Sequence, residues 1–172
     1  QIFDQALEKP ECAGMGTTLA LALFQDNSVV FAHVGDSRIY RLRGGELTQI
    51  TSDHSLVQEL VDNGYLSEEE ARLSVSRNLI TRALGIAENV EADVRQDETE
   101  TGDLYLLCSD GLSDLVNDDD LKDILEARRM DMESAAKAMV DLANQKGGTD
   151  NISVILVSIE EAYSDEQGIG AR

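Results

Sequence analysis

Positive charge is scarce in this sequence of 172 residues. Lysine and arginine number 14 against 34 aspartates and glutamates, which gives a formal net charge of −20. A surface of this sign repels the phosphate backbone of DNA and RNA, which argues against nucleic-acid binding as a main function. The same surplus of carboxylates attracts divalent cations.

Cysteines and long apolar runs are scarce as well. The two cysteines, Cys12 and Cys108, do not form a disulfide framework; this pattern is typical of a reducing compartment, and we expect a cytoplasmic protein. No apolar run approaches the ~18 residues of a membrane-spanning helix, so no membrane span is expected. The 42% of hydrophobic residues suffices for a sizeable core, and the length predicts a single domain.

Apolar runs with a period of two predict the strands of the fold. The run TTLALALF and the run ISVILVSI are apolar on both faces, which is typical of strands covered on both sides. Arg43, Gly44 and Gly45 predict a hairpin turn between two further strands. The predicted strands are residues 17–24, 29–34, 37–42, 46–50, 104–108 and 152–159.

Helical spacing and capping residues predict the helices. One is expected after Ser55, and a second after Ser67, where the three following glutamates complete a capping-box pattern. Two more are expected after residues 118–120 and over residues 132–145. Strands joined mostly by hairpins, with helices grouped elsewhere, predict an α+β fold in which one sheet packs on another and the helices lie outside.

Three aspartates stand beside glycine-containing bends at the ends of predicted strands. Asp36 lies in VGDSR and Asp110 in LLCSDG, each directly after a strand, and Asp150 lies in GGTDN before the last one. Loops held by strand ends are common places for functional sites. Mg²⁺ and Mn²⁺ prefer such oxygen ligands, so a metal site is one interpretation. Three ordinary turn aspartates are the other.

Other chemistries fit the sequence less well. A cysteine phosphatase needs an arginine six residues after Cys108, where Asp114 stands. A phosphatase with an aspartyl nucleophile at Asp110 needs a second aspartate at position 112, which is a leucine. We expect His33 to be packed and hydrogen-bonded and His54 to face solvent, and two histidines without cysteine pairs argue against zinc.

Four motifs in order resemble one family. GMGTT at residues 14–18, VGDSR at 34–38, CSDGL at 108–112 and GTDNI at 148–152 resemble the metal-dependent Ser/Thr protein phosphatases of the bacterial kind (PPM, or type 2C). The resemblance implies a four-layer α-β-β-α sandwich of two antiparallel sheets flanked by helices. It also implies hydrolysis of phosphoserine and phosphothreonine in proteins by a metal-bridged water. No protein nucleophile is then needed, and no general acid is identified.

The resemblance also implies roles for individual residues. Asp110 and Asp150 correspond to ligands of the second metal, and Asp36 with Asp110 to the pair that binds a third, so that two or three Mn²⁺ or Mg²⁺ ions are expected per active site. Asn151 is expected to orient the Asp150 loop and Arg38 to pair with acids. Gly35, Ser37 and Gly111 support the site, and Asp114 is expected to cap a helix.

The flap of the family corresponds to residues of about 51–84. Asp53, His54 and Arg77 fall in its matching segments, while Ser74 and Val75 stand where many bacterial members have His-Pro. Three glutamates at positions 68–70 make this flap acidic, which favours phosphosites flanked by basic residues. The expected partners are phosphorylated proteins made by a Ser/Thr kinase, and we expect a monomer.

The resemblance lacks its first motif. Family members carry an Asp-Gly-x-Gly-Gly sequence upstream of residues 14–18, and it is absent here. We therefore expect residues 1–160 to be the carboxy-terminal portion of one catalytic domain, incomplete at its N-terminus, and residues 161–172 to be a solvated tail. Two alternatives stay open: a catalytically silent phosphatase-like module that binds phosphoproteins or partners, and a cation-binding structural domain.

Overall fold

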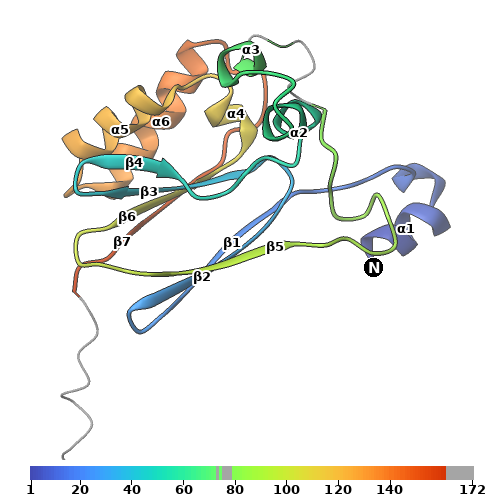
Figure 1. The fold of residues 1–172 in the computed structure, drawn as a ribbon, viewed down its shortest axis with the longest axis horizontal. Helices are drawn as coiled ribbons and strands as arrows, with labels where there is room; N and C mark the ends of the chain where they lie inside the picture. Colours follow the sequence, from blue (N-terminus) through green and yellow to red (C-terminus); the bar gives the residue numbers. More distant parts are fainter. Residues whose placement is uncertain (73, 75–78, 162–172) are drawn as a thin grey trace, which may run out of the picture.

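Two antiparallel sheets form the centre of the molecule (Figure 1). The structure, a computed structural model, describes residues 1–72, 74 and 79–161. The first sheet has the order β1-β2-β5 and the second the order β4-β3-β6-β7. The strands are β1 (Leu19–Gln25), β2 (Ser28–Val34), β3 (Arg38–Arg43), β4 (Glu46–Gln49), β5 (Asp93–Glu98), β6 (Leu104–Cys108) and β7 (Val154–Ser158).

Helices flank the sheets, so the α+β class with two packed antiparallel sheets is confirmed. Local hydrogen bonds explain where several helices begin: Ser55 Oγ accepts from Gln58 N, and Ser67 and Glu70 bond reciprocally as a capping box. The helices are α1 (Ile2–Glu8), the short 3₁₀ turn η1 (Pro10–Cys12), α2 (Leu56–Asp62), α3 (Glu68–Arg72), α4 (Asp110–Ser113), α5 (Asp118–Ala127) and α6 (Met132–Gln145).

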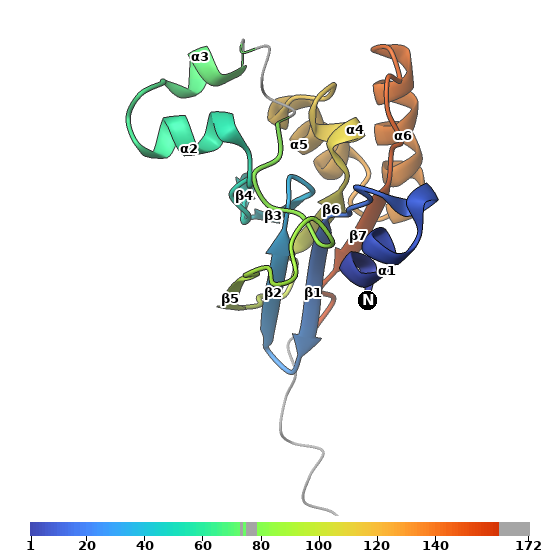
Figure 2. The same ribbon diagram turned by 90° about the vertical axis from the view of Figure 1, so that its right-hand side faces the viewer.

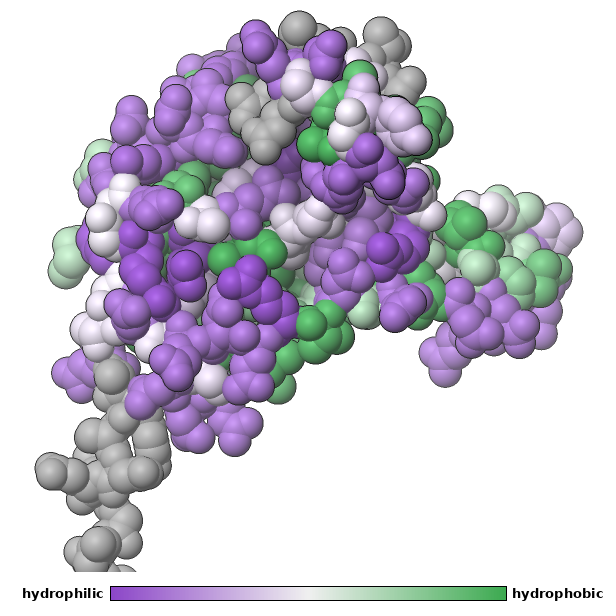
Figure 3. Space-filling model, viewed as in Figure 1, coloured by the Kyte–Doolittle hydropathy of each residue, from purple (hydrophilic) through white to green (hydrophobic). Residues whose placement is uncertain are grey.

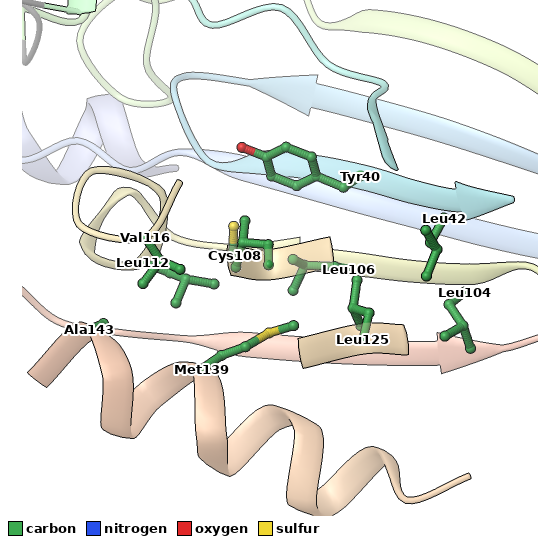
Figure 4. Close-up of a cluster of buried hydrophobic side chains, with 11 residues drawn as sticks. Tyr40, Leu42, Leu104, Leu106, Cys108, Leu112, Val116, Leu125, Met139 and Ala143 are labelled. Atoms are coloured by element: carbon green, nitrogen blue, oxygen red, sulfur yellow. The ribbon is translucent and has the colours of Figure 1, made fainter. Parts of the chain in front are cut away.

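The larger core lies between the four-stranded sheet and helices α4 to α6 (Figure 4). Side chains of β3 and β6 that point to this side meet Leu125 of α5 and Met139 of α6, and all are almost completely buried. Every residue of β6 is buried, because helices cover one of its faces and the other sheet covers the other. This central strand ends at the predicted metal site.

The smaller core lies between the two sheets. Val29 and Phe31 of β2 pack against Ile39 of β3 and Tyr105 of β6, and the rings of Phe24 and Tyr105 meet edge to face with centroids 5.2 Å apart. The packing fixes how the ends of β2, β3 and β6 lie relative to one another.

The outer face of the three-stranded sheet differs from the prediction. Leu21 and Leu23 of β1 are 42% and 58% exposed, and Val94 of β5 is 67% exposed. The prediction that β1 is covered on both faces is therefore wrong for the described residues, because no described helix packs on this side (Figures 1 and 2). Of the four layers, the outer helical layer over this sheet has no counterpart in the described part of the chain.

The face of the molecule drawn in Figure 3 is mostly hydrophilic. Hydrophilic side chains cover most of the face shown there, with small hydrophobic areas between them, in keeping with the net charge of −20. None of the helices in the described ranges combines the length and the apolar character that crossing a bilayer requires.

Candidate metal centre

Asp36 and Asp110 come to the same end of the sandwich because β3 and β6 are paired. Asp36 lies between β2 and β3, and Asp110 begins α4 directly after β6. Arg38 is the register partner of Cys108, so the antiparallel pair brings the two aspartates together. Both line one cavity of about 640 Å³. Its lining includes residues of α2 and α3 and residues of α4 and α5; Figure 2 shows where these helices lie.

Burial and neighbouring carboxylates disfavour the charged forms of both aspartates. Burial raises the pKa of Asp36 to about 6, and the negative charge of Asp110 adds to the effect. Burial also raises the pKa of Asp110, and the charges of Asp150 and Asp114 raise it further, although the Gly111 N–H at 2.9 Å opposes them. Within the described ranges, no lysine or arginine forms an ion pair with either aspartate. A divalent cation would relieve this repulsion.

The loop of Asp150 is tied to Asp110 from the side of β7. Ser109 Oγ donates to Asn151 O at 2.9 Å and accepts from Ser153 N at 3.0 Å. A Cβ atom at Gly111 would clash with the backbone of Asn151, so a glycine is required there. Asp150 is exposed and lies outside the lining of the cavity, but its charge reaches Asp110.

Arg38 makes the acid pairing that the sequence predicts. Its guanidinium donates to both carboxylate oxygens of Asp53 at 2.7–3.0 Å and to Tyr40 Oη at 3.1 Å. This bidentate pair links β3 to the start of the flap. Ser37 Oγ lies 2.8 Å from Thr18 Oγ1 and joins the site to the GMGTT motif.

Asp114 has a place at the cavity that sequence reasoning ranked second. We expected it to cap a helix, and it is the C-cap residue of α4, while Asn117 caps the start of α5. Asp114 lines the cavity, and its charge raises the pKa of both Asp36 and Asp110. Asp114 follows Asp110 by four residues, about one helical turn, and this spacing could have placed both side chains on the same face of the helix.

The two histidines lie together beside the site. His33 is packed and hydrogen-bonded as predicted, but the prediction that His54 faces solvent is wrong, because His54 is only 4% exposed. One potential ligand atom from each of His33, His54 and Asp93 lies within 4.8 Å of the others. However, Gly35 N–H donates to Nδ1 of His54 at 3.1 Å, so the proton of a neutral ring sits on Nε2. That nitrogen has no lone pair for a metal unless the bond to Gly35 is given up.

Arg77, which the resemblance places in the flap, lies outside the described residues. Cys108 is buried, and burial raises the pKa of its thiol to about 12, which makes it an inert core group rather than a nucleophile.

Comparison with known proteins identifies the fold that carries these aspartates. The sequence profile described as "Protein phosphatase 2C" matches residues 2–152. This chain belongs to the protein phosphatase 2C family. Family membership agrees with the two packed sheets and with the four motifs at their ends.

Relatives of this phosphatase 2C chain are bacterial. It is 45% identical over 159 residues to the serine/threonine protein phosphatase PstP of Mycobacterium tuberculosis. The match covers 92% of this chain and 30% of PstP. It is 43% identical to the serine/threonine phosphatase stp of Listeria welshimeri, covering 91% of this chain and 62% of that one. The chain thus spans only part of the length of its curated relatives.

A solved structure of the PstP catalytic domain in complex with two manganese ions is also similar. It is 42% identical, aligns with a TM-score of 0.84, and the match covers 93% of this chain and 66% of that one. In this chain, the carboxylate oxygens of Asp36 and Asp110, which form no ion pair with a described lysine or arginine and whose pKa values are raised, fit such a hard cation.

Proposed function

We propose that this protein hydrolyses phosphoserine and phosphothreonine in proteins with the help of Mn²⁺ or Mg²⁺ ions, two or three per active site. The observation that carries the proposal is the pair of Asp36 and Asp110 in one cavity, where both pKa values are raised and no described cation partner is present. Carboxylates that have no arginine partner can bind a metal ion, which neutralises their charge. Family membership and the manganese-bound relative support the proposal.

Asp36, Asp110 and Asp150 would hold the cations. Asp36 and Asp110 share the cavity, while Asp150 approaches from the loop fixed by Ser109 and Asn151. Bound cations supply charge neutralisation for the phosphoryl group and a water of lowered pKa. In the overall reaction, a water oxygen forms the new bond to phosphorus, the bond to the serine or threonine oxygen breaks, and that oxygen takes up a proton.

The protein side chains around the cations have supporting tasks. Arg38 is held by Asp53, which restricts it to organising the loop. The cavity wall opposite α2 carries Asp118 and Asp119 at the start of α5. Negative charge there favours substrates with basic residues near the phosphorylated side chain.

We further propose the molecular setting of this activity. Residues 1–160 form part of one phosphatase catalytic domain with its flap at about 51–84, which is supported by the family match over residues 2–152. The substrates are phosphoproteins made by a Ser/Thr kinase, and the protein acts as a monomer in the cytoplasm. The two free cysteines, of which Cys108 is buried, support a reducing compartment.

Phosphate release from a phosphothreonine peptide with basic flanks tests the proposal. It is measured with the chain as it stands and with the complete natural protein, because the relatives are longer. We expect activity with Mn²⁺, none in EDTA, and a loss of about 100-fold in Asp110→Asn and Asp150→Asn, since loss of one metal ligand weakens the cation site.

Three outcomes would contradict the proposal. Peptide binding without phosphate release by the complete protein would favour a silent phosphoprotein-binding module. A rise in melting temperature with Mn²⁺ but no hydrolysis would favour a cation-binding structural domain. Full activity of Asp110→Asn would also remove the proposed role of the aspartates.

A further inference from the structure

Gly35 joins β2 to the predicted metal ligand Asp36, and its backbone has little freedom. Its φ is +110°, a region that favours glycine. A Cβ atom at this position would clash with the side chain of Thr18. The turn that presents Asp36 is therefore a tight one, and whatever holds the backbone of Gly35 determines where the carboxylate lies.

Two histidines hold that backbone through both of its polar groups. The N–H of Gly35 donates to Nδ1 of His54 at 3.1 Å. Its carbonyl oxygen accepts from the backbone N–H of His54 at 2.8 Å and from Nε2 of His33 at 2.8 Å. That carbonyl belongs to the peptide bond between Gly35 and Asp36. Both rings are buried, with His33 2% and His54 4% exposed, and their centroids lie 4.4 Å apart.

The opposite side of the His54 ring faces a charged group. Nε2 lies 3.1 Å from Asp93 Oδ2, although its N–H does not point straight at that oxygen. Asp93 Oδ1 accepts from Arg82 at 2.7 Å. The hydrogen bond from Arg82, and then the neighbouring His54 ring, lower the pKa of Asp93, so the carboxylate stays charged. A charged acceptor keeps the proton of His54 on Nε2 and leaves Nδ1 free to accept from Gly35.

His54 also connects the metal site to the flap. Its carbonyl oxygen accepts from Thr81 N at 2.8 Å, so the chain leading out of the flap is fastened at the same residue. No polar atom of the His54 backbone is left over for solvent, since its N–H and its carbonyl are both used. A residue that served only to fill space would not need this set of partners.

We propose that His54 is a positioning residue for Asp36. Its ring holds the Gly35 N–H, in the peptide between Val34 and Gly35, while its backbone N–H holds the Gly35 carbonyl, in the peptide that leads to Asp36. Fixing Gly35 from both sides in this way sets the place of the Asp36 carboxylate for cation binding. The inference rests on the proposed function, because it takes Asp36 as a metal ligand. The acceptor at Nδ1 is the essential feature, and Asp93 with Arg82 maintains it.

Substitutions that separate the acceptor from the packing test this role. His54→Leu keeps bulk but removes the acceptor, whereas the amide oxygen of His54→Asn can still accept from Gly35 N–H. Val29→Ala is the control, because Val29 is buried at the other end of β2 and touches neither Gly35 nor the flap contacts. The readout is the Mn²⁺ affinity of each protein, followed by electron paramagnetic resonance of the free ion, together with the melting temperature.

We expect His54→Leu to bind Mn²⁺ at least about tenfold more weakly and His54→Asn to recover most of the loss, as for groups that orient metal ligands. Val29→Ala lowers the melting temperature but leaves Mn²⁺ affinity unchanged. Unchanged Mn²⁺ affinity in a folded His54→Leu overturns the inference. If wild type binds Mn²⁺ and hydrolyses the phosphopeptide while His54→Leu binds Mn²⁺ equally well, only the inference fails. If Mn²⁺ binding weakens in His54→Leu as expected but wild type does not hydrolyse the phosphopeptide, only the proposed function fails.

A measurement on the unaltered protein covers the case in which His54→Leu does not fold. In ¹⁵N nuclear magnetic resonance, the account predicts an unprotonated Nδ1 and a protonated Nε2 in His54. It further predicts that Mg²⁺ shifts the signals of the Gly35 amide and the His54 ring together. A proton on Nδ1, or no response of either group to Mg²⁺, overturns the inference.

Discussion

Strand β6 has an aspartate beside each of its ends, and the two have opposite surroundings. Asp103, just before the strand, is 1% exposed and accepts hydrogen bonds from Arg43, from Glu100 N and from Tyr105 Oη. Asp110, just after the strand, has no such basic partner among the described residues and lines the same cavity as Asp36. Carboxylates of the same type thus serve the fold at one end and, in the proposed function, bind cations at the other.

The electrostatic consequences are also opposite. Burial alone would raise the pKa of Asp103, but hydrogen bonds, above all from Arg43, lower it overall. At the other end, burial raises the pKa of Asp36 to about 6, and neighbouring carboxylates add to it. The presence of an arginine, rather than burial, thus separates the aspartate with a lowered pKa from the candidate metal ligand with a raised one.

The largest effect on stability is expected from removing Arg43. Arg43→Met leaves Asp103 buried without its cation, and we expect a loss of about 3 kcal/mol in the free energy of unfolding. Arg95→Met is the control, because the Arg95–Asp97 pair is far more exposed at 55% for the arginine, and such pairs contribute about 0–1 kcal/mol. Urea unfolding measures both. Equal losses in the two variants would contradict the structural role of the buried pair.

The pH dependence of the metal-free protein is expected to differ between the two ends. Asp103 has a lowered pKa in the folded protein. Its contribution to the free energy of unfolding is therefore present above its ordinary pKa of 3.8 and is lost as the pH falls through its folded pKa. Asp36 has a raised pKa in the folded protein. Its contribution to the free energy of unfolding is therefore present below pH 3.8 and is lost as the pH rises through about 6. The variant Asp36→Asn carries no charge at this position, so it does not lose stability in this way.

Thermal unfolding in EDTA from pH 4 to pH 7 measures this difference. We expect the stability of Asp36→Asn relative to wild type to increase over this interval and to level off above pH of about 6. A relative stability that is independent of pH would show that the charge of Asp36 is not penalised in the folded protein.

The smallest effect is expected for Glu100, the exposed partner of Arg43. Glu100 is 64% exposed, and its ion pair with Arg43 is 2.7 Å long. Because solvent screens such pairs, Glu100→Gln is expected to change the free energy of unfolding by less than about 1 kcal/mol. Urea unfolding is again the measurement. A loss as large as that of Arg43→Met would show that Arg43 stabilises the fold through Glu100 and not through Asp103.

The sequence predicts the helix-covered half of the molecule well. Strand β6 and helix α6 have the predicted bounds, because their apolar residues follow the period of the element and Gly147 with Gly148 stops the helix. Strand β5 was missed, because its sequence DVRQDE is polar and mostly exposed and it pairs only with β2. Edge strands of this kind carry no apolar period to detect.

Part of the arrangement at the candidate metal centre could be predicted from the sequence, whereas the contacts that support it could not. Aspartates beside glycines at strand ends are visible in the sequence, and the pairing of β3 with β6 brings two of them together. The burial of His54 is not visible, because it depends on the flap folding back onto Gly35, 19 residues away. The exposure of Leu21 and Leu23 depends on what covers the outer face, which local patterns do not encode.

Calorimetric titration with Mn²⁺ tests the central claim most directly, namely that Asp36 and Asp110, which have no arginine partner in the described part of the chain, hold the cations. It compares wild type with Asp110→Asn at the predicted centre and with Glu100→Gln at the opposite end of the same sandwich. The account predicts that wild type and Glu100→Gln bind Mn²⁺ with the same affinity and that Asp110→Asn binds at least about tenfold more weakly. Equal Mn²⁺ binding by Asp110→Asn and wild type would contradict it.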